Sequence, residues 1–317
     1  MTFEELVASL PQRGMEWHRE TLLENSRNNA AHVVYTIHDL PRCYAPCLVI
    51  SAGPSLYRQK TLSRFKAASF KGTVVSTDGA YIQCLKAGIR PDFVVTLDPH
   101  PTRIVRWFGD PDFERNSHGD DYFSRQDLDV SFRENAAQQN AENIRTVDAH
   151  PVPLVICTTA PQNVVERTSR FPRFWFSPLV DSPADHGSLT RAICTATGCP
   201  ALNTGGTVGT AAWNFAHSTL HSRHIAVVGM DFGYYADTPL EQTQSWNMLG
   251  GDRQYYPARM GHWGAAYTDP TYEWYLRNFL DLLKAADTRI VNCTEGGLLQ
   301  GDRIDCMNLE AWLKSFS

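Results

Sequence analysis

Three aspartates stand where short apolar segments of the chain end: Asp78, Asp98 and Asp231. Carboxylate oxygens are ligands that Mg²⁺ prefers, with water and phosphate oxygens filling its remaining positions. Asp78 also lies about 25 residues after Gly53, and an acid near that distance from a glycine turn commonly binds a ribose hydroxyl. We predict that Asp78 contacts ribose or metal, and that Asp98 and Asp231 bind Mg²⁺ or position an acceptor hydroxyl. The alternative for each is the cap of a helix or turn. Gly79, which follows Asp78, is a further candidate contact to the nucleotide.

A glycine-containing turn follows the first apolar run and consists of Gly53, Pro54, Ser55 and Leu56. Gly53 permits backbone conformations and a close ligand approach that other residues do not, and Pro54 suits the first position of a helix. Ser55 adds a hydroxyl to the N–H groups of the new helix, which favour an anion. The turn lacks the spacing of the G-x-G-x-x-G dinucleotide motif. It predicts either phosphate binding or the simple start of a helix.

A second turn, in the string 203-NTGGTVGTAAW-213, contains Thr204, Gly205, Gly206 and Thr207. An apolar helix-like segment follows it, so its N–H groups are candidates for binding a phosphate. The string lacks the lysine of a Walker A loop. We predict that these four residues contact the nucleotide. The alternative is a tight turn that lets the helix pack close to a sheet.

Two further candidates are Glu295, at the end of the last apolar run, and His262. Glu295 is suited either to ligand binding or to capping a turn. His262 is a candidate acid or base because an imidazole exchanges protons near neutral pH, although most lone histidines have no such role. It lies in the aromatic and Gly-rich segment 232–268, which lacks a clear periodicity. Such long segments are commonly lids, binding loops or disordered, and we expect a lid.

Seven short apolar runs position these residues, at 47–53, 73–79, 93–99, 153–159, 173–178, 225–231 and 289–294. They are continuous instead of alternating, which is typical of strands buried on both faces. Helix-like segments lie between several of them, at 56–68, 79–88, 207–220 and 271–286. The alternation predicts an α/β fold: a doubly wound, mostly parallel, Rossmann-like sheet with helices on both faces. Ligands bind beyond the carboxyl ends of the strands in such sheets.

The chain has 317 residues, of which 43% are hydrophobic and 20% charged, a composition that excludes a disordered protein or a fibre. We expect a helical appendage at 1–45 and a Rossmann-like nucleotide-binding catalytic domain at 46–317. The segment 107–146 holds nine acids and four arginines, which accounts for the net charge of −5. We interpret it as an acidic insertion. No basic surplus remains elsewhere, so a general nucleic-acid binder is excluded.

The N-terminus is acidic where a secretory leader is basic, and no apolar run has the length of a membrane span. The eight cysteines lack zinc-ligand or C-x-x-C spacing. We interpret them as reduced, buried thiols of a cytoplasmic protein. Its expected partners are a small-molecule nucleotide, a hydroxyl acceptor and a second copy of the chain in a homo-oligomer.

The strings 49-VISAGPSL-56, 75-VSTDGAYIQCLKAGIRPDFVVTLDP-99, 205-GGTVGTAAW-213, 226-AVVGMDFGYY-235 and 291-VNCTEGG-297 resemble a known family. This is the 6-hydroxymethylpterin pyrophosphokinase-like (MptE-like) family, whose domain is also the core of bacterial motility accessory factors. The first turn is also similar to the nucleotide-binding turn of bacterial sialyltransferases with a related fold.

The resemblance implies a nucleotide-dependent transferase. One branch uses ATP and Mg²⁺ to transfer diphosphate to a pterin-type alcohol, and the other transfers a nonulosonic, sialic-acid-like sugar from a CMP-sugar to a hydroxyl. The positions that match the family pattern, and are implied as nucleotide and metal contacts, are Gly53 to Leu56, Asp78, Asp98, Gly205, Gly206 and Asp231. The acidic insertion departs from the pattern and leaves the acceptor open. A non-catalytic nucleotide-binding protein is the remaining alternative.

Overall fold

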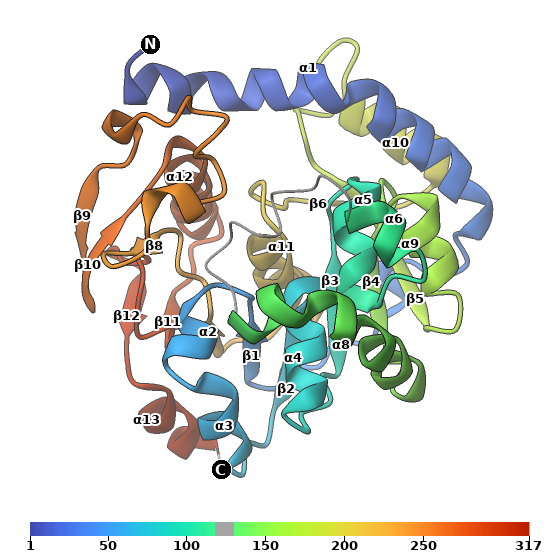
Figure 1. Cartoon of the computed structure of the whole chain (residues 1–317). Coiled ribbons are helices and arrows are strands. Elements are labelled where there is room, and N and C mark those ends of the chain that lie inside the picture. The colour runs from blue at the N-terminus through green and yellow to red at the C-terminus, as the bar shows by residue number, and fades with distance from the viewer. Residues whose placement is uncertain (118–129, 317) are drawn as a thin grey trace.

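A nine-stranded parallel sheet forms the centre of the molecule (Figure 1). The computed structural model describes residues 1–117 and 130–316, which include all of these strands. The order is β12-β11-β7-β1-β2-β3-β4-β5-β6, and every neighbouring pair is parallel. The strands are β1 (Cys47–Ile50), β2 (Thr73–Thr77), β3 (Phe93–Thr96), β4 (Leu154–Cys157), β5 (Arg173–Pro178), β6 (Ala201–Leu202), β7 (Ile225–Val228), β11 (Ile290–Asn292) and β12 (Ile304–Cys306). The predicted α/β, Rossmann-like fold is confirmed.

The direction in which the chain adds strands reverses beside β1. From β1 it proceeds outward through β2 to β6, then returns to place β7 on the other side of β1, followed by β11 and β12. Cys47 pairs with Ile225 and Ile50 with Val228, so β1 and β7 end together. Such a reversal is a topological switch point, where open α/β sheets form a crevice beyond the strand ends. The sheet is therefore doubly wound, as predicted.

The central strands are apolar throughout because helices cover both faces of the sheet. Successive side chains of a strand point to opposite faces, so Val49 belongs to one layer of the core while Leu48 and Ile50 belong to the other. All three are fully buried.

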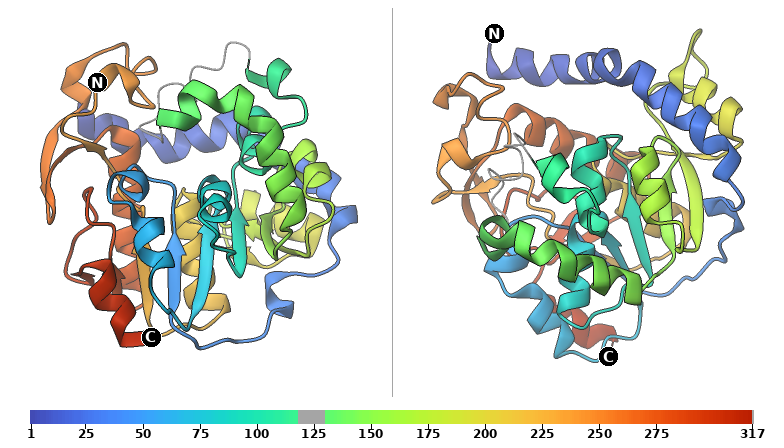
Figure 2. Two further views of the ribbon diagram at one scale, coloured as in Figure 1. Left: turned by 60° about the horizontal axis from the view of Figure 1, so that its bottom comes forward. Right: turned by 45° about the vertical axis from the view of Figure 1, so that its right-hand side comes forward.

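Two layers of helices lie on the two faces, as Figures 1 and 2 show. The first consists of α11 (Val208–Asn214), the π-helical turn Phe215–Thr219 and α12 (Pro270–Ala285). Trp213 and Phe279 of this layer are fully buried, with ring centroids 5.3 Å apart. The second layer consists of α2 (Ser55–Arg58), α3 (Thr61–Lys66), α4 (Asp78–Lys86), α5 (Pro101–Ile104), α6 (Phe113–Ser117), α8 (Val130–Ala149), α9 (Gln162–Arg167) and α13 (Leu309–Leu313).

The prediction of one continuous helix at 56–68 is wrong, because the structure has two short helices there, α2 and α3. Lys60 separates them in the left-handed region, with φ +51°. The acidic segment 107–146 contains α6 and most of α8 and lies between β3 and β4. Its residues 118–129 are outside the described part of the chain.

The longest helix, α1 (Phe3–Asn29), lies along one edge of the molecule (Figure 1). It contacts α12 near its start and α10 (Leu189–Thr197) farther along. Glu4 forms an ion pair with Arg277 of α12 at 2.8 Å. At the other end, the Asn29 side chain is buried and donates to the carbonyls of Thr158 and Ala160 after β4. The N-terminal helix is thus held at both ends by the rest of the fold.

The segment 232–268, expected to be a lid-like loop, contains a small antiparallel sheet. Its order is β8 (Tyr234–Tyr235), β10 (Gly264–Tyr267) and β9 (Ala258–Gly261). Tyr234 is buried and its hydroxyl donates to buried Asp269 at 2.9 Å. Disorder of this segment was therefore the wrong alternative. Aromatic packing orders it, and such packing leaves no periodic signal in the sequence.

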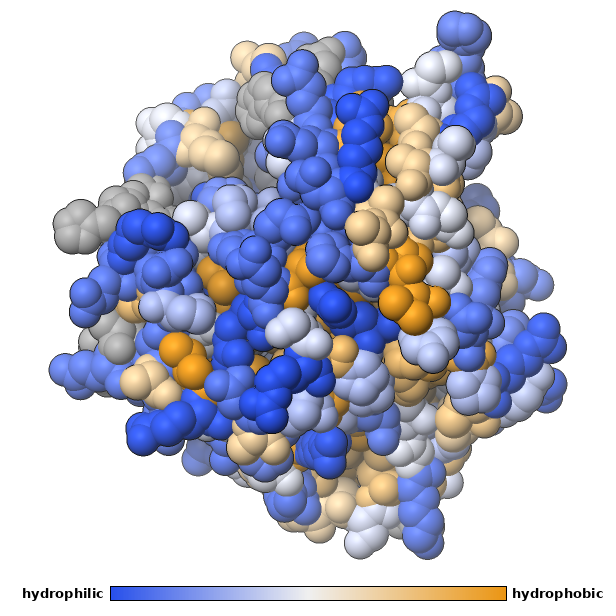
Figure 3. All heavy atoms as spheres, turned by 90° about the vertical axis from the view of Figure 1, so that its right-hand side faces the viewer, coloured by the Kyte–Doolittle hydropathy of each residue, from blue (hydrophilic) through white to orange (hydrophobic). Residues whose placement is uncertain are grey.

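All eight cysteines are free thiols, as predicted. The expectation that all are buried is wrong for three of them, because Cys43 is exposed and Cys194 and Cys306 are only partly buried. Among the described residues, no helix has both the length and the apolar character needed to cross a bilayer. Hydrophilic side chains cover most of the face in Figure 3, and the hydrophobic ones form small groups.

Candidate functional site

The ends of β1 and β7 approach each other so closely that two positions accept only glycine. The Gly53 amide donates to the Gly229 carbonyl at 2.9 Å. A Cβ atom on Gly229 would lie 2.0 Å from the Ser51 carbonyl oxygen, and Gly229 has φ +69°. A Cβ on Gly53 would lie 2.2 Å from a carboxylate oxygen of Asp231. The switch point is therefore a tightly closed junction of two backbones.

Asp231 joins this junction to the first glycine turn. Its side chain is buried, and Oδ2 accepts from the Ser55 hydroxyl at 2.7 Å and from the Ser55 amide at 3.4 Å. The Asp231 carbonyl accepts from Leu298, in the turn after β11. The structure thus brings Gly53, Ser55 and Asp231 together, as predicted. The Asp231 carboxylate therefore fixes the turn.

Asp78 and Asp98 lie at the ends of the neighbouring strands β2 and β3. Asp78 is buried and accepts from the Thr96 hydroxyl and the Gly79 amide, both at 2.7 Å. Burial raises the pKa of Asp78 to about 7, and the charge of Asp98 acts in the same direction. Asp98 is exposed and accepts from the His100 amide at 2.7 Å. Asp78 therefore exchanges a proton near neutral pH, and Asp98 faces solvent.

The turn before α11 uses its amides internally. The Gly205 and Gly206 amides donate to Asn203 Oδ1 at 3.0 Å and to Thr204 Oγ1 at 3.4 Å, and the Thr207 amide donates to the Thr204 carbonyl. The expectation that this turn exposes several N–H groups to a phosphate is not met, because two side chains and one carbonyl of the turn accept them. The alternative, a turn that seats its helix on the sheet, fits the geometry better.

Close packing of α11 on the sheet is visible at Gly209. A Cβ atom there would lie 3.0 Å from the Ser51 hydroxyl. The turn itself packs on α12, since a Cβ atom on Gly206 would meet the ring of Trp274 at 2.9 Å.

Three buried hydroxyls at the strand ends were missed by the sequence analysis: those of Ser51, Ser76 and Thr77. Each side chain is at most 6% exposed, and none of the three hydroxyls has a hydrogen-bond partner in the described protein. Ser51 and Thr77 follow Val49 and Val75 by two residues, so they lie on the same face of the sheet, towards α11. A buried hydroxyl without a partner costs about 1–3 kcal/mol. Ser76 lies between Val75 and Thr77 in β2, so its side chain points to the opposite face.

Two predicted residues, Glu295 and Leu56, have structural contacts, and a third, His262, is exposed. Glu295 forms an ion pair with Arg64 at 2.6 Å and accepts from the Leu309 amide at 2.9 Å, so the capping interpretation fits it. Leu56 is buried in the core, 3% exposed. His262 is exposed between β9 and β10, with its ring against Trp263 at 4.6 Å.

Pro54 and Gly79 complete the set of predicted residues. Pro54 precedes α2 with helical dihedral angles, as its expected helix-starting role requires. Gly79 lies in the first turn of α4, where a Cβ atom would come 2.9 Å from the Ala52 side chain. Gly79 therefore lets α4 pack against the end of β1.

The predicted Mg²⁺ site does not form as a carboxylate cluster. Over residues 1–117 and 130–316, no group of three or more His, Cys, Asp or Glu side chains is arranged to hold a metal ion. Asp78 and Asp231 already accept hydrogen bonds from protein groups. The metal assignment of Asp78, Asp98 and Asp231 stays a prediction.

The fold and the switch-point site are those of a Rossmann-like α/β protein. Residues 20–110 match the family model described as 6-hydroxymethylpterin diphosphokinase MptE-like, which confirms the resemblance seen in the sequence. The match includes the turn at 53–56 and both Asp78 and Asp98.

Comparison with solved structures finds a similar fold in the MAf glycosyltransferase from Magnetospirillum magneticum AMB-1. The TM-score is 0.58, the sequence identity is 16%, and the similarity covers 91% of this chain. The chain spans 38% of the length of that structure. A search of curated proteins found no match.

The junction of β1 and β7 predicts a large difference between two glycines that both have positive φ. Gly229→Ala should lower the free energy of unfolding by more than about 3 kcal/mol, because strain and a backbone clash add. Gly250→Ala is the matched control: its φ is +68°, and its Cβ would meet nothing within 4 Å. Gly250→Ala should lower the free energy of unfolding by about 1–2 kcal/mol. Urea unfolding measures both, and equal losses would contradict the tight junction.

The raised pKa of Asp78 predicts a specific pH dependence of stability. Between about pH 4 and pH 7 the folded chain retains a proton that the unfolded chain has released, so the free energy of unfolding falls as pH rises. Asp78→Asn should remove this part of the slope, worth about 4 kcal/mol at most. Urea unfolding at several pH values measures it, with exposed Asp185→Asn as the control. An unchanged slope in Asp78→Asn would contradict the assignment.

Proposed function

We propose that this protein is a transferase that binds a nucleotide-linked donor at the switch point between β1 and β7. The observation that carries the proposal is the set of unpartnered buried hydroxyls beside the closed junction of Gly53 and Gly229. Ligands of open α/β sheets bind at this location. The family matched at residues 20–110 and the similar solved structure both carry names of transferases.

Each residue of the junction has a distinct proposed role. The hydroxyls of Ser51 and Thr77 donate to phosphate oxygens of the donor, and the absence of a side chain at Gly53 lets those oxygens approach the backbone. Asp231 holds Ser55 and so keeps the turn in place. Asp78 binds a ribose hydroxyl, for which a carboxyl group that titrates near pH 7 is suited both as donor and as acceptor.

Between the two chemistries, we favour transfer of a nucleotide-activated sugar. Asp78 and Asp231 are buried and already accept hydrogen bonds from Thr96 and Ser55. Transfer of a diphosphate from ATP would require carboxylates free to bind Mg²⁺ beside the phosphates. The second candidate is therefore the diphosphokinase, which the family match favours. Asp98, which is exposed, is the carboxylate available to an acceptor hydroxyl or a metal in either case.

The choice between the donors predicts a pattern of ligand-induced stabilisation. CMP and CTP without Mg²⁺ should raise the melting temperature by a few degrees at saturating concentration. ATP should have a smaller effect under the same conditions. Thermal shift with each nucleotide, with and without Mg²⁺, measures this. Stabilisation by ATP with Mg²⁺ alone would favour the diphosphokinase, and no response to any nucleotide would contradict the transferase proposal.

The proposed phosphate contacts predict a loss of binding without a loss of stability. Ser51→Ala and Thr77→Val should each weaken nucleotide binding about tenfold, because each removes a hydrogen bond to a charged group. Neither should lower the free energy of unfolding, since these hydroxyls have no protein partner. Calorimetric titration and urea unfolding measure the two quantities.

The matched control for these variants is Ser26→Ala. Ser26 lies in α1 and is also a buried serine whose hydroxyl lacks a partner in the described protein. Its removal should leave nucleotide binding unchanged. If Ser51→Ala and Thr77→Val bind nucleotide as tightly as the unaltered protein, the ligand lies elsewhere. If the unaltered protein binds nucleotide but shows no detectable turnover, the non-catalytic alternative holds.

A further inference from the structure

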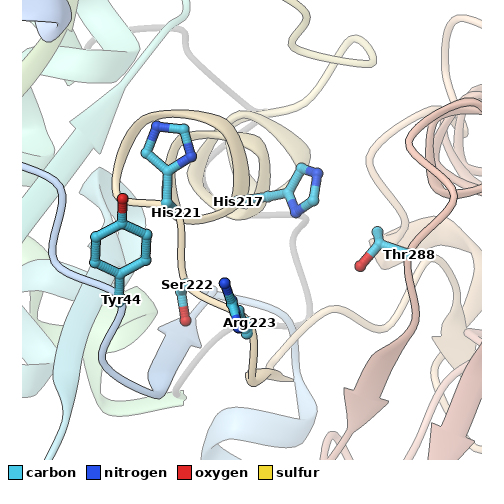
Figure 4. Close-up of a pocket in the computed structure, with 6 residues that line it drawn as sticks. All are labelled: Tyr44, His217, His221, Ser222, Arg223 and Thr288. Atoms are coloured by element: carbon cyan, nitrogen blue, oxygen red, sulfur yellow. The ribbon is translucent and has the colours of Figure 1, made fainter.

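A cavity lies near the amino ends of the strands, whereas the switch point lies at their carboxyl ends. Its volume is about 380 Å³, and its lining residues are Tyr44, His217, His221, Ser222, Arg223 and Thr288 (Figure 4). It is adjacent to the amino ends of the strands, because the His224 carbonyl accepts from the amide of Cys47, where β1 begins. None of the residues predicted from the sequence to bind the nucleotide lines it.

The side chains around the cavity have one sign of charge. Arg223 is always cationic, and His217 and His221 become cationic when protonated. No carboxylate is among the lining residues. The acid next to Thr288, Asp287, is paired with Arg303 at 2.9 Å. The lining therefore favours an anion over a cation.

The backbone beside the cavity is strained at two residues, Tyr44 and His221, whose side chains are neighbours. Tyr44 and His221 both have φ +56°, in the left-handed region that residues other than glycine seldom occupy. Their rings lie 6.0 Å apart, and the amides of Cys43 and Tyr44 both donate to the Leu220 carbonyl. Such strain persists only where surrounding contacts fix it, and it gathers at binding sites.

The imidazole of His217 is held in a fixed orientation. It stacks on the buried Trp213 ring, with centroids 5.2 Å apart and planes at 7°. Burial lowers the pKa of His217, and the neighbouring His221 acts in the same direction. An anion in the cavity would reverse both effects by stabilising the protonated ring.

We propose that this cavity binds the phosphate or sulfate group of a small molecule. Arg223 supplies the permanent charge and a planar pair of donors suited to such a group. His217 and His221, from the same segment as Arg223, and the Tyr44 hydroxyl, from the segment before β1, supply further donors. A divalent metal at the two histidines would be repelled by the guanidinium. The site stands apart from the proposed nucleotide site, so either assignment can fail without the other.

Calorimetric titration with sodium sulfate tests the proposal, at constant ionic strength against sodium chloride. Sulfate keeps its charge over this pH range, so any pH dependence comes from the protein. Binding should strengthen several-fold between pH 8 and pH 6. Burial lowers the pKa of His217, and a bound anion would oppose this effect by stabilising the protonated ring. Arg223 is the other charged side chain of the lining, and Asp287, next to Thr288, is paired with Arg303. Inorganic phosphate should compete for the same site.

Variants identify the residues responsible. Arg223→Ala should weaken sulfate binding at least about tenfold, and exposed Arg170→Ala, in the loop before β5, should leave it unchanged. His217→Asn removes the ring that stacks on Trp213 and should abolish most of the gain at pH 6. Equal affinity of Arg223→Ala and the unaltered protein would overturn the proposal. So would Zn²⁺ binding that needs His217 and His221 without any response to sulfate.

Discussion

The backbone contact between Gly53 and Gly229 is the constraint on which the candidate site depends. It brings β1 and β7 together at the point where the chain reverses its direction across the sheet. With any side chain at Gly229, that residue would collide with the Ser51 carbonyl. The hydrogen bond from Ser55 to Asp231 then ties the turn after β1 to the end of β7. The hydroxyls of Ser51 and Thr77 are buried beside this junction without protein partners. Each unmade hydrogen bond costs free energy, and a stable fold tolerates this cost where a ligand or water molecule provides the partner.

The two ends of the parallel strands have different chemistry. At the carboxyl ends, buried carboxyl groups and hydroxyls surround a closed junction, and burial raises the pKa of Asp78. At the amino ends, Arg223 and two histidines surround an open cavity without a lining carboxylate. We therefore propose a different ligand for each: a nucleotide-linked donor bound by hydrogen bonds at the carboxyl ends of the strands, and a compact anion bound mainly by charge at the amino ends.

Much of the fold could be predicted because each central strand is buried on both faces. Continuous apolar runs such as 47–53 and 225–231 indicate that burial directly. The short strands β6 and β12 were missed because two or three residues carry too little pattern to be distinguished from loops. The small sheet within 232–268 was missed for another reason. Its order comes from contacts of buried aromatic side chains, such as the ring of Tyr234 with that of Tyr272, which join residues far apart in the sequence.

For the candidate site, the sequence by itself determined which turns and acids follow the strands, because strand ends are local features marked by Gly, Pro and Asp. That sufficed to select Gly53, Ser55 and Asp231, which the fold brings together. Only the tertiary structure decided that Glu295 pairs with Arg64, that the amides of the 204–207 turn are used internally, and that Ser51 and Thr77 have no partner. The physical reason is that the availability of a polar group depends on the neighbours that other segments place around it.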